Sequence, residues 1–428
     1  METPLRTSAL PVWLLDPVAP TVDAATHSAY RLEASQRSWL LPIGGAVVLL
    51  VLSVVGWLTD PKQFYFSYLV GWAFCVSLSL GSLFFVMIHH LTRSHWAVVV
   101  RRIAEVAAMS FPLLAVLFIP ILLGMHDVFH WTHADLYDPA SPHYDEILAG
   151  KQSWLNVPFF VGRMVFYFAV WILISTKLYR LSLQQDVNPD HDIPRKQRWW
   201  SALGMPLFAV TLSFGSFDFL MSLDPHWFST IFGVYFFAGA FWSAVAFITI
   251  TALIVQRSGA MQGIVSTNHY HDLGKWMFAF TIFWAYIAFS QYMLIWYGHL
   301  EEEEIWYEHR LTHGWGYHSA ALIIMHFILP FLILLFQSAK KNLPLLAVMA
   351  VWFFVMQWFD LHWLALPALT AERIAEGQHA STFHWLDLTT WLGLFALFAG
   401  MFFRRLSRHP LVPVNDPRLG RSLDHAHV

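Results

Sequence analysis

Acidic and basic side chains stand inside apolar stretches of this sequence. Asp218 lies in "SFGSFDFLMSLDP" and Asp360 in "QWFDLHWL", while Glu105 follows "WAVVVRRIA". Ionisable groups are costly inside a membrane and are candidates for function there. A carboxyl or imidazole group in such a site can accept and release protons near neutral pH. These residues therefore predict proton transfer in apolar surroundings.

Membrane helices are the elements expected to position these groups. Hydrophobic residues make up 57% of the 428 residues and charged residues only 12%, against about 25% charged residues in soluble proteins. A membrane span needs about 20 apolar residues. Ten stretches qualify, at 39–59, 65–88, 98–123, 158–178, 202–223, 228–254, 274–297, 315–336, 344–367 and 384–403. The predicted fold class is an all-α integral membrane protein with about ten transmembrane helices.

The single cysteine, Cys75, limits the cofactors that this chain can hold. One cysteine excludes a disulfide framework and a four-cysteine iron–sulfur site, and the CxxCH pattern of haem attachment is absent. We therefore predict neither a metal site nor a catalytic residue, and no cofactor bound by this chain alone.

The positive charges predict how the chain is oriented. Ten spans place both termini on one side, and 20 of the 25 Lys and Arg residues fall on that side. Such an excess is typical of cytoplasmic segments. The sequence thus predicts a multi-pass protein of the bacterial inner membrane, with cytoplasmic tails at 1–38 and 406–428 around a transmembrane domain at 39–405.

The polar residues within the spans form two sets, one toward each side of the membrane. Glu105 lies toward the inner side and His326 lies near the middle of its span. The set toward the outer side comprises Arg163, Asp218, Ser290, Gln291, His318, Asp360, His362 and Asp387. Two such sets are expected of two proton half-channels, or of a quinone pocket with a proton exit.

Several of these groups also have a structural interpretation. Asp218 and Arg163 can form a buried ion pair. Arg101 and Arg102 are typical of a lipid-headgroup anchor, with Glu105 as the i+4 partner of Arg101.

Helical geometry separates other neighbours in the sequence. Asp360 and His362 are two residues apart, so they point to different faces of a helix. Asp387 stands at the beginning of its span and can be interfacial. Of the polar residues in the seventh span, Ser290 and Gln291 are the better candidates for an interior path.

A block of four consecutive glutamates follows the seventh span: Glu301, Glu302, Glu303 and Glu304. We expect Gly298 to end that span at the outer surface and the four glutamates to lie in an outer loop. An acidic outer surface suits docking of a basic partner such as a soluble cytochrome c, or of an extrinsic subunit.

Three stretches of the sequence together resemble one family. They are "IHHLTRSHWAVVVRRIAE" (88–105), "SFDFLMSLDPHWFSTIFGVYFFAG" (216–239) and "FWAYIAFSQYMLIWYGHLEEEEIWYEHR" (283–310). The chain is similar, over about 39–405, to the second polysulfide-reductase-like (NrfD-like) membrane subunit of alternative complex III, a quinol:cytochrome c oxidoreductase. After "WYG" this sequence has "HLEEEE", where the family has a shorter acidic element.

The resemblance implies two four-helix bundles, roughly 65–223 and 228–367, with the first and tenth spans at their flanks. It implies a sister NrfD-like subunit, an iron–sulfur subunit, multihaem cytochrome c subunits and small membrane-anchored subunits as partners. Haem c and iron–sulfur clusters would be carried by those partners, and this chain would conduct protons and could bind a quinone such as menaquinone. By motif, the resemblance carries over to Asp218, Asp224, His226, Ser290, Gln291, Tyr292 and the acidic loop at Glu301 to Glu304.

Two other functions are compatible with the sequence. A secondary transporter would be favoured by an inverted repeat and by spans interrupted at mid-membrane, and no second copy of "FDFLMSLDP" occurs. A passive scaffold of the same complex would be favoured if the buried charges only pair with one another.

Overall fold

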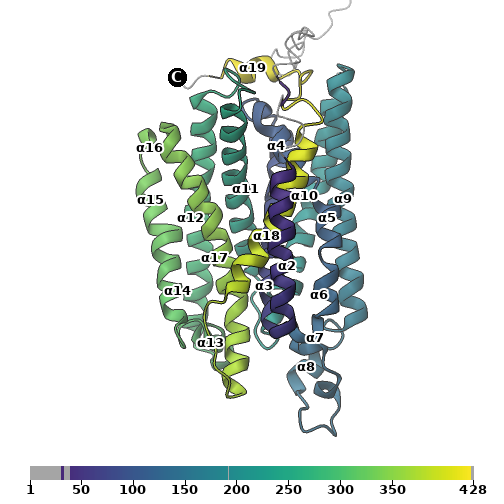
Figure 1. The fold of residues 1–428 in the computed structure, drawn as a ribbon, viewed down its shortest axis with the longest axis vertical. Helices are drawn as coiled ribbons and strands as arrows, with labels where there is room; N and C mark the ends of the chain where they lie inside the picture. The colour runs from purple at the N-terminus through teal and green to yellow at the C-terminus, as the bar shows by residue number, and fades with distance from the viewer. Residues whose placement is uncertain (1–29, 33–38, 191, 426–428) are drawn as a thin grey trace, which may run out of the picture.

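The computed structural model describes residues 30–32, 39–190 and 192–425, and every regular element in this part of the chain is helical (Figure 1). The ten predicted spans are confirmed by ten helices or helix runs that are long and apolar enough to cross a membrane. The uninterrupted spans are α2 (Leu40–Thr59), α3 (Pro61–Leu91), α9 (Val157–Val187), α11 (Phe232–Arg257), α12 (Thr267–Gly298), α17 (Leu343–Ala375) and α18 (Trp385–Leu406).

Three spans contain more than one helical segment. The third span comprises α4 (Val98–Ala108), α5 (Phe111–Val116) and α6 (Ile119–Leu123), the fifth α10 (Asp192–Phe219) and η4 (Met221–Leu223), and the eighth α14 (Trp315–Ala321), the π-helical η5 (Leu322–Ile328) and α15 (Leu329–Leu334). The third span breaks just before Pro112 and Pro120. Proline lacks a backbone N–H and clashes with the preceding turn, so it favours a break at these positions.

Short helices lie in the connections between the spans and in the segment after the last span. They are α7 (Met125–Val128), η2 (His130–Thr132), η3 (Ala134–Tyr137), α8 (Glu146–Lys151), α13 (Glu301–His309), α16 (Gln337–Lys341) and α19 (Leu419–Leu423). Side-chain caps fix where some of the long helices begin. Asp60 accepts from the backbone N–H of Gln63 at 3.0 Å at the beginning of α3, and Asn156 accepts from that of Phe159 at 3.0 Å at the beginning of α9.

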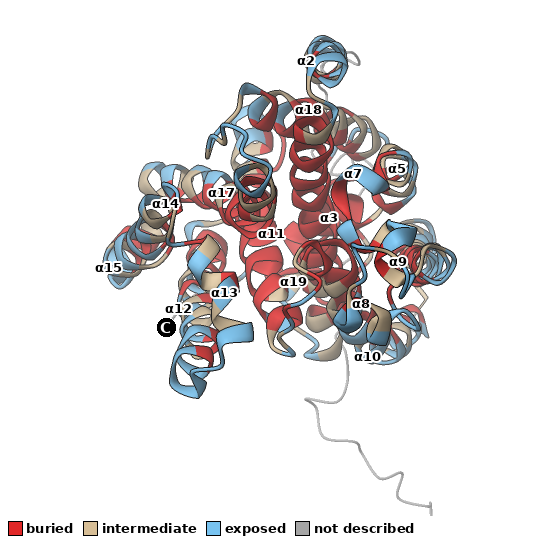
Figure 2. Ribbon diagram, turned by 90° about the horizontal axis from the view of Figure 1, so that it is seen from below, coloured by how far each residue is buried: buried red, intermediate tan, exposed pale blue. Residues whose placement is uncertain are grey.

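Helix α3 forms the centre of the molecule, and it packs against α4, α10, α11, α17 and α18 (Figure 2). In the apolar stretch of α3, 94% of the residues are buried, whereas in that of α2 only 17% are buried. Helix α2 packs on α18 at the periphery and leaves most of its surface for lipid (Figure 2). Gly81 permits the close approach of α3 to α11, because a Cβ atom there would lie 2.1 Å from the carbonyl oxygen of Ala240.

The two ends of the bundle differ in what covers them (Figure 1). The backbone N–H of Leu411 donates to the carbonyl of Tyr30 at 2.7 Å, so the segments before the first span and after the last span lie side by side. We call this end the tail face and the opposite end, which carries α8 and α13, the α13 face. The predicted C-terminal tail at 406–428 is not a free segment, because Leu411, Val414 and Asp416 are fully buried in it. Of the predicted N-terminal tail at 1–38, all but residues 30–32 lie outside the described residues.

Candidate functional site

A cavity of about 670 Å³ lies near the α13 face, between α12 and the run formed by α14 and η5. Its walls are largely apolar, with Phe289, Ile323 and Phe327 among them. Phe289 and Ile323 are also exposed on the lateral surface of the helix bundle, so the cavity opens to the side of the bundle. The volume is in the range of small-molecule sites, which is about 300–1,000 Å³. The cavity is therefore suited to an apolar ligand that enters from the membrane.

Polar side chains gather at one part of the cavity wall. Gln291 lines it and is buried, its Oε1 accepts from the hydroxyl of Ser229 at 3.0 Å, and its Nε2 donates to the hydroxyl of Tyr307 at 3.3 Å. Burial raises the pKa of Tyr307, on α13, to about 12, so its hydroxyl stays protonated. Ser290 does not line the cavity. The structure thus separates the two predicted residues, and only Gln291 belongs to the site.

Arg310, which directly follows α13, brings a buried cation to the same wall. Its guanidinium donates to the carbonyls of Trp306 at 2.8 Å and Leu364 at 2.6 Å, and it lies 3.5 Å from the centre of the Trp306 ring. Its nearest carboxylate, Asp224, is 3.4 Å away, and Nε has no hydrogen-bond partner. Burial lowers the pKa of Arg310 to about 10, although Asp224 acts in the opposite direction, so the group remains charged at neutral pH.

Arg310 is not among the site residues predicted from the sequence. It is only one of the few positive charges on the predicted outer side. A signal is nevertheless available, because Trp306 precedes Arg310 by four residues on a helix. Aromatic rings at that spacing favour contact with a guanidinium.

Asp360 stands behind the cavity wall and is buried. It accepts a hydrogen bond of 2.5 Å from the hydroxyl of Tyr235 and one of 3.2 Å from the indole of Trp284. Both donors line the cavity. Within the described ranges, no Lys, Arg or His side chain lies within 4.0 Å of this carboxyl. Asp360 is thus a buried carboxyl held by two neutral donors, both of which face the cavity.

His326 lies on η5, next to this group of residues. Its ring is stacked between those of Trp242, at 4.1 Å, and Trp284, at 3.8 Å. It is fully buried, and neither ring nitrogen has a hydrogen-bond partner. Pro330 follows four residues later and cannot donate to the carbonyl of His326, which accounts for the π-helical turn. With both ring faces covered, His326 contributes packing to the wall that carries Trp284.

Asp218 and Arg163 form a separate, fully paired cluster. The guanidinium donates to both carboxylate oxygens, at 2.8 Å and 2.7 Å. Tyr167 and Trp154 donate to the same carboxylate, and the rings of Trp154 and Phe159 lie 4.2 Å and 4.4 Å from the guanidinium carbon. This arrangement is the buried ion pair that the sequence allowed, and it leaves neither group free to accept another partner.

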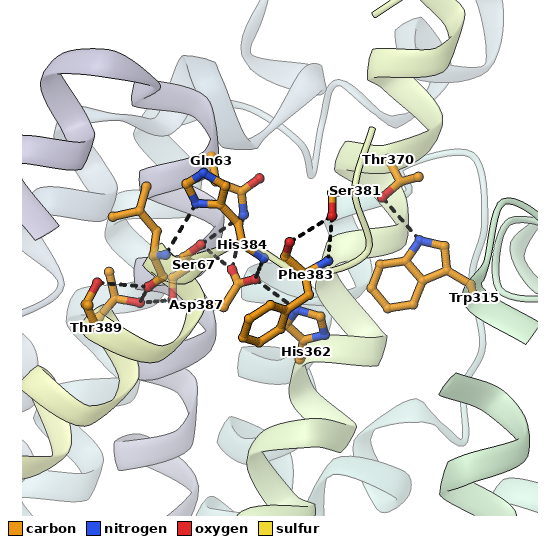
Figure 3. A network of polar contacts seen from close by, with 12 residues as sticks. Gln63, Ser67, Trp315, His362, Thr370, Ser381, Phe383, His384, Asp387 and Thr389 are labelled. Atoms are coloured by element: carbon orange, nitrogen blue, oxygen red, sulfur yellow. Dashed lines mark hydrogen bonds and ion pairs between the residues drawn. The ribbon is translucent and has the colours of Figure 1, made fainter. Parts of the chain in front are cut away.

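Asp387 is the centre of a third cluster, which joins α3, α17 and α18 (Figure 3). Its carboxylate accepts from Ser67 at 2.5 Å, from Gln63 at 3.1 Å and from the backbone N–H of His384 at 2.7 Å, and His362 Nε2 lies 3.3 Å away. Asp387 lies in the first turn of α18, at a span end as predicted, and its side chain is buried inside the protein.

His362 therefore faces Asp387 while Asp360 faces Tyr235, so the predicted separation of the two neighbours is confirmed. His318 lies beside the same cluster, with its ring 6.2 Å from that of His362 and stacked on Phe359. Neither histidine lines the cavity.

Glu105 belongs to a fourth cluster, at the tail face. It accepts from Arg101 Nε at 3.0 Å, as the i+4 spacing predicted. Arg101 also reaches Asp416 at 2.7 Å and Arg102 reaches Asp186 at 2.7 Å. Arg101 and Arg102 are fully buried, so the prediction of a headgroup anchor is wrong.

Asp416, in the C-terminal tail, closes this fourth cluster. Burial alone would raise its pKa, but the guanidiniums of Arg418 and Arg101 outweigh burial and hold the pKa well below its usual range. The carboxylate is thus charged at any physiological pH. Because the tail covers the cluster, the polar groups predicted toward the inner side are buried within the protein.

The glutamate block lies in the connection after α12, as expected, but this part of the connection is a short helix. The first turn of α13 consists of Glu301, Glu302, Glu303 and Glu304. Negative charge is favourable beside a helix N-terminus, which explains why the block folds this way. Glu301 and Glu302 are exposed, whereas Glu303 and Glu304 are partly buried. The role of the block as a docking surface stays a prediction.

The link between α12 and α13 is held by the block itself. Gly298 is the last residue of α12, as predicted, and His299 follows in a left-handed conformation with φ of 48°. His299 Nδ1 lies 2.8 Å from Glu304 Oε1. The linking residue is therefore tied to the first turn of the next helix.

We expect the His299 imidazole to titrate at a higher pH than an exposed histidine, because the hydrogen bond and charge of Glu304 raise its pKa. A raised pKa means that the contact stabilises the link below the ordinary pKa and is lost as pH rises through the raised value. NMR titration of histidine-labelled protein measures this directly. Glu304→Gln should return the pKa of His299 toward its ordinary value, and the matched Glu301→Gln should change it less. An unchanged pKa in Glu304→Gln would show that the contact does not form.

Apart from Ser290 and the glutamate block, the predicted site residues lie in or beside four separate groups. Only Gln291 and Asp360 meet at the cavity, where Tyr235, Tyr307 and Arg310 join them. In the described part of the chain, no group of three or more His, Cys, Asp and Glu side chains is placed to hold a metal ion. Neither a protein-family model nor a curated protein matches the sequence.

Proposed function

We propose that this chain is an integral membrane subunit of a quinol:cytochrome c oxidoreductase of the alternative complex III type. Its part in the complex would be to bind quinone and to move protons, while haem c and iron–sulfur clusters of partner subunits carry the electrons. The proposal includes two four-helix bundles with two flanking helices, and a tail face on the cytoplasmic side of a bacterial inner membrane. It is supported by the three family-like stretches and by the side-opening cavity.

The observation that carries the proposal is the position of Asp360 behind the cavity. A quinone is apolar except for two ring oxygens, so it suits a largely apolar cavity with a few donors on one wall. Arg310 and Tyr307 are such donors, and both line the cavity. The apolar remainder of the cavity would accommodate the first part of the isoprenoid tail.

Proton transfer from a quinol follows from the hydrogen bonds in place. The Tyr235 hydroxyl donates a hydrogen bond of 2.5 Å to Asp360. The Tyr235 oxygen can therefore accept a proton from a ligand hydroxyl while the Tyr235 proton passes to the carboxyl. Asp360 can take up that proton because no described cation lies against it, whereas Asp218 forms an ion pair with Arg163. The two electrons that leave the quinol would go to the iron–sulfur clusters of a partner subunit. The second proton would follow the first through Tyr235 once Asp360 has passed its own proton on.

A scaffold role is the second candidate, and the pairing of Asp218 with Arg163 favours it. Every oxygen of that carboxylate has a donor, which is expected of a structural ion pair. The two roles are compatible within one chain, because the paired cluster and the cavity are separate.

Blocking the cavity tests the proposed function. Ala288 lines the cavity on α12, and Ala279 lies on the same helix with its side chain exposed outside the cavity. In the complex purified from membranes, Ala288→Trp should lose the bound quinone that solvent extraction and chromatography quantify, together with quinol turnover. Ala279→Trp should keep both. Retention of quinone and turnover in Ala288→Trp would refute the cavity as the site, and isolation of the chain without haem or iron–sulfur partners would refute the complex.

A further inference from the structure

A second cavity, of about 360 Å³, lies near the tail face between the α4–α5 break and the end of α18. Three arginines line it: Arg404, Arg405 and Arg408. We propose that this cavity binds the phosphate of an anionic phospholipid, with the acyl chains lying along its apolar wall. This site is distinct from the quinone cavity and lies near the opposite face of the protein.

The three guanidiniums are not neutralised by the protein. In the described ranges, none of them lies within 4.0 Å of a carboxylate. Arg405 donates to the carbonyl of Met109, Arg404 lies 5.0 Å from the ring of Trp39, and Arg408 is exposed. Positive charge without a protein partner favours an anion from outside the chain.

The nearby carboxylates already form ion pairs with other arginines. Glu105 accepts from Arg101, and Asp186 pairs with Arg102 at 2.7 Å. Both belong to the buried cluster beneath the tail. The three arginines that line the cavity therefore have no carboxylate partner among the described residues and can bind an anionic ligand.

The apolar wall identifies the ligand as a lipid. Val106, Pro112, Leu113, Met401 and Phe402 line the cavity together with the arginines. These residues come from two membrane spans, whereas Arg404 and Arg405 stand in the last turn of α18. A basic rim above an apolar wall at the end of two spans matches a phospholipid, whose phosphate sits at the interface and whose chains extend into the bilayer.

The break in the third span makes room for this ligand. Helix α4 ends at Ala108 and α5 begins at Phe111, with Pro112 in its first turn. Met109 lies in the break and lines the cavity, and its carbonyl is the one that Arg405 holds. Arg405 thus both supports the break and points to the cavity, so it should be left intact in a test.

Double replacement of the two other arginines tests the proposal. Arg404→Gln/Arg408→Gln should lower the amount of phosphatidylglycerol that stays bound in native mass spectrometry by about 25-fold, since each basic residue near a membrane surface contributes about fivefold. The purified complex would be exchanged into vesicles of phosphatidylglycerol and phosphatidylcholine beforehand. Arg195→Gln/Lys196→Gln is the matched control, because both residues are exposed and form only loose ion pairs of 3.9 Å. The control should keep the bound lipid.

Three outcomes would overturn the proposal. One is equal retention of phosphatidylglycerol by the double variant and the native chain. Another is equal retention of phosphatidylcholine and phosphatidylglycerol by the native chain, because it would show no preference for negative charge. The third is displacement of the lipid by millimolar inorganic phosphate, because the site would then recognise free phosphate instead of a lipid headgroup.

Discussion

Replacement of Asp360 by Asn should lower quinol turnover of the proposed complex by about 10²- to 10⁴-fold, the range that a positioned acid–base group contributes. The amide oxygen of Asn can still accept from Tyr235, whose hydrogen bond to Asp360 is 2.5 Å long. The 3.2 Å bond from Trp284 goes to the other carboxylate oxygen, where Asn carries its NH2 group, so that bond is lost. Asn cannot take up the proton that Tyr235 passes on. The loss should therefore appear in steady-state turnover and in proton release, and not in the bound quinone.

Tyr235→Phe is the companion variant, because it removes the hydroxyl and leaves the carboxyl in place. It should reproduce most of the loss, while Tyr167→Phe, which removes a hydroxyl that donates to Asp218, should keep turnover. Thermal unfolding of each variant separates loss of function from loss of fold. If Asp360→Asn turns over at the native rate in an intact complex, Asp360 does not relay protons.

Replacements in the Arg163–Asp218 pair should change mainly the free energy of unfolding, and not quinol turnover. Arg163→Met alone should cost about 3–5 kcal/mol, because it leaves a buried carboxylate without its cation. Asp218→Asn should cost a similar amount by leaving the guanidinium unpaired. The double variant Arg163→Met/Asp218→Leu should recover most of the loss, since apolar side chains can replace a buried ion pair at little cost.

Unfolding in increasing denaturant measures these differences, and proton release by the surviving complexes decides the role. Proton release at the native rate in the double variant supports a structural pair. Loss of proton release in a stable double variant would place Asp218 on a proton path and contradict the structural role. A double variant no more stable than either single variant would show that the pair does not act as one unit.

Local periodicity explains what the sequence predicted correctly. The ten spans follow from apolar stretches of sufficient length. The i+4 spacing gave the contact of Glu105 with Arg101, and the two-residue spacing separated Asp360 from His362. Each of these inferences needs only helical geometry within one segment.

Contacts between distant segments explain what the sequence could not predict. Arg101 resembles a headgroup anchor in the sequence because its partner Asp416 lies 315 residues away in the chain. The role of Arg310 depends on Leu364, 54 residues later, and that of Tyr235 on Asp360, 125 residues later. Membrane spans share the same apolar composition, so hydropathy does not specify which spans pack together.

The buried tail has a consequence for biosynthesis. Asp416 follows all ten spans in the chain, so the ribosome makes it after every span has been synthesised. Arg101 must therefore wait through the synthesis of 315 residues before it meets Asp416. A chain truncated before residue 411 would keep all ten spans but leave the charged cluster of Arg101 and Arg102 uncovered at the tail face. Docking of the tail is thus a late step in the assembly of this fold.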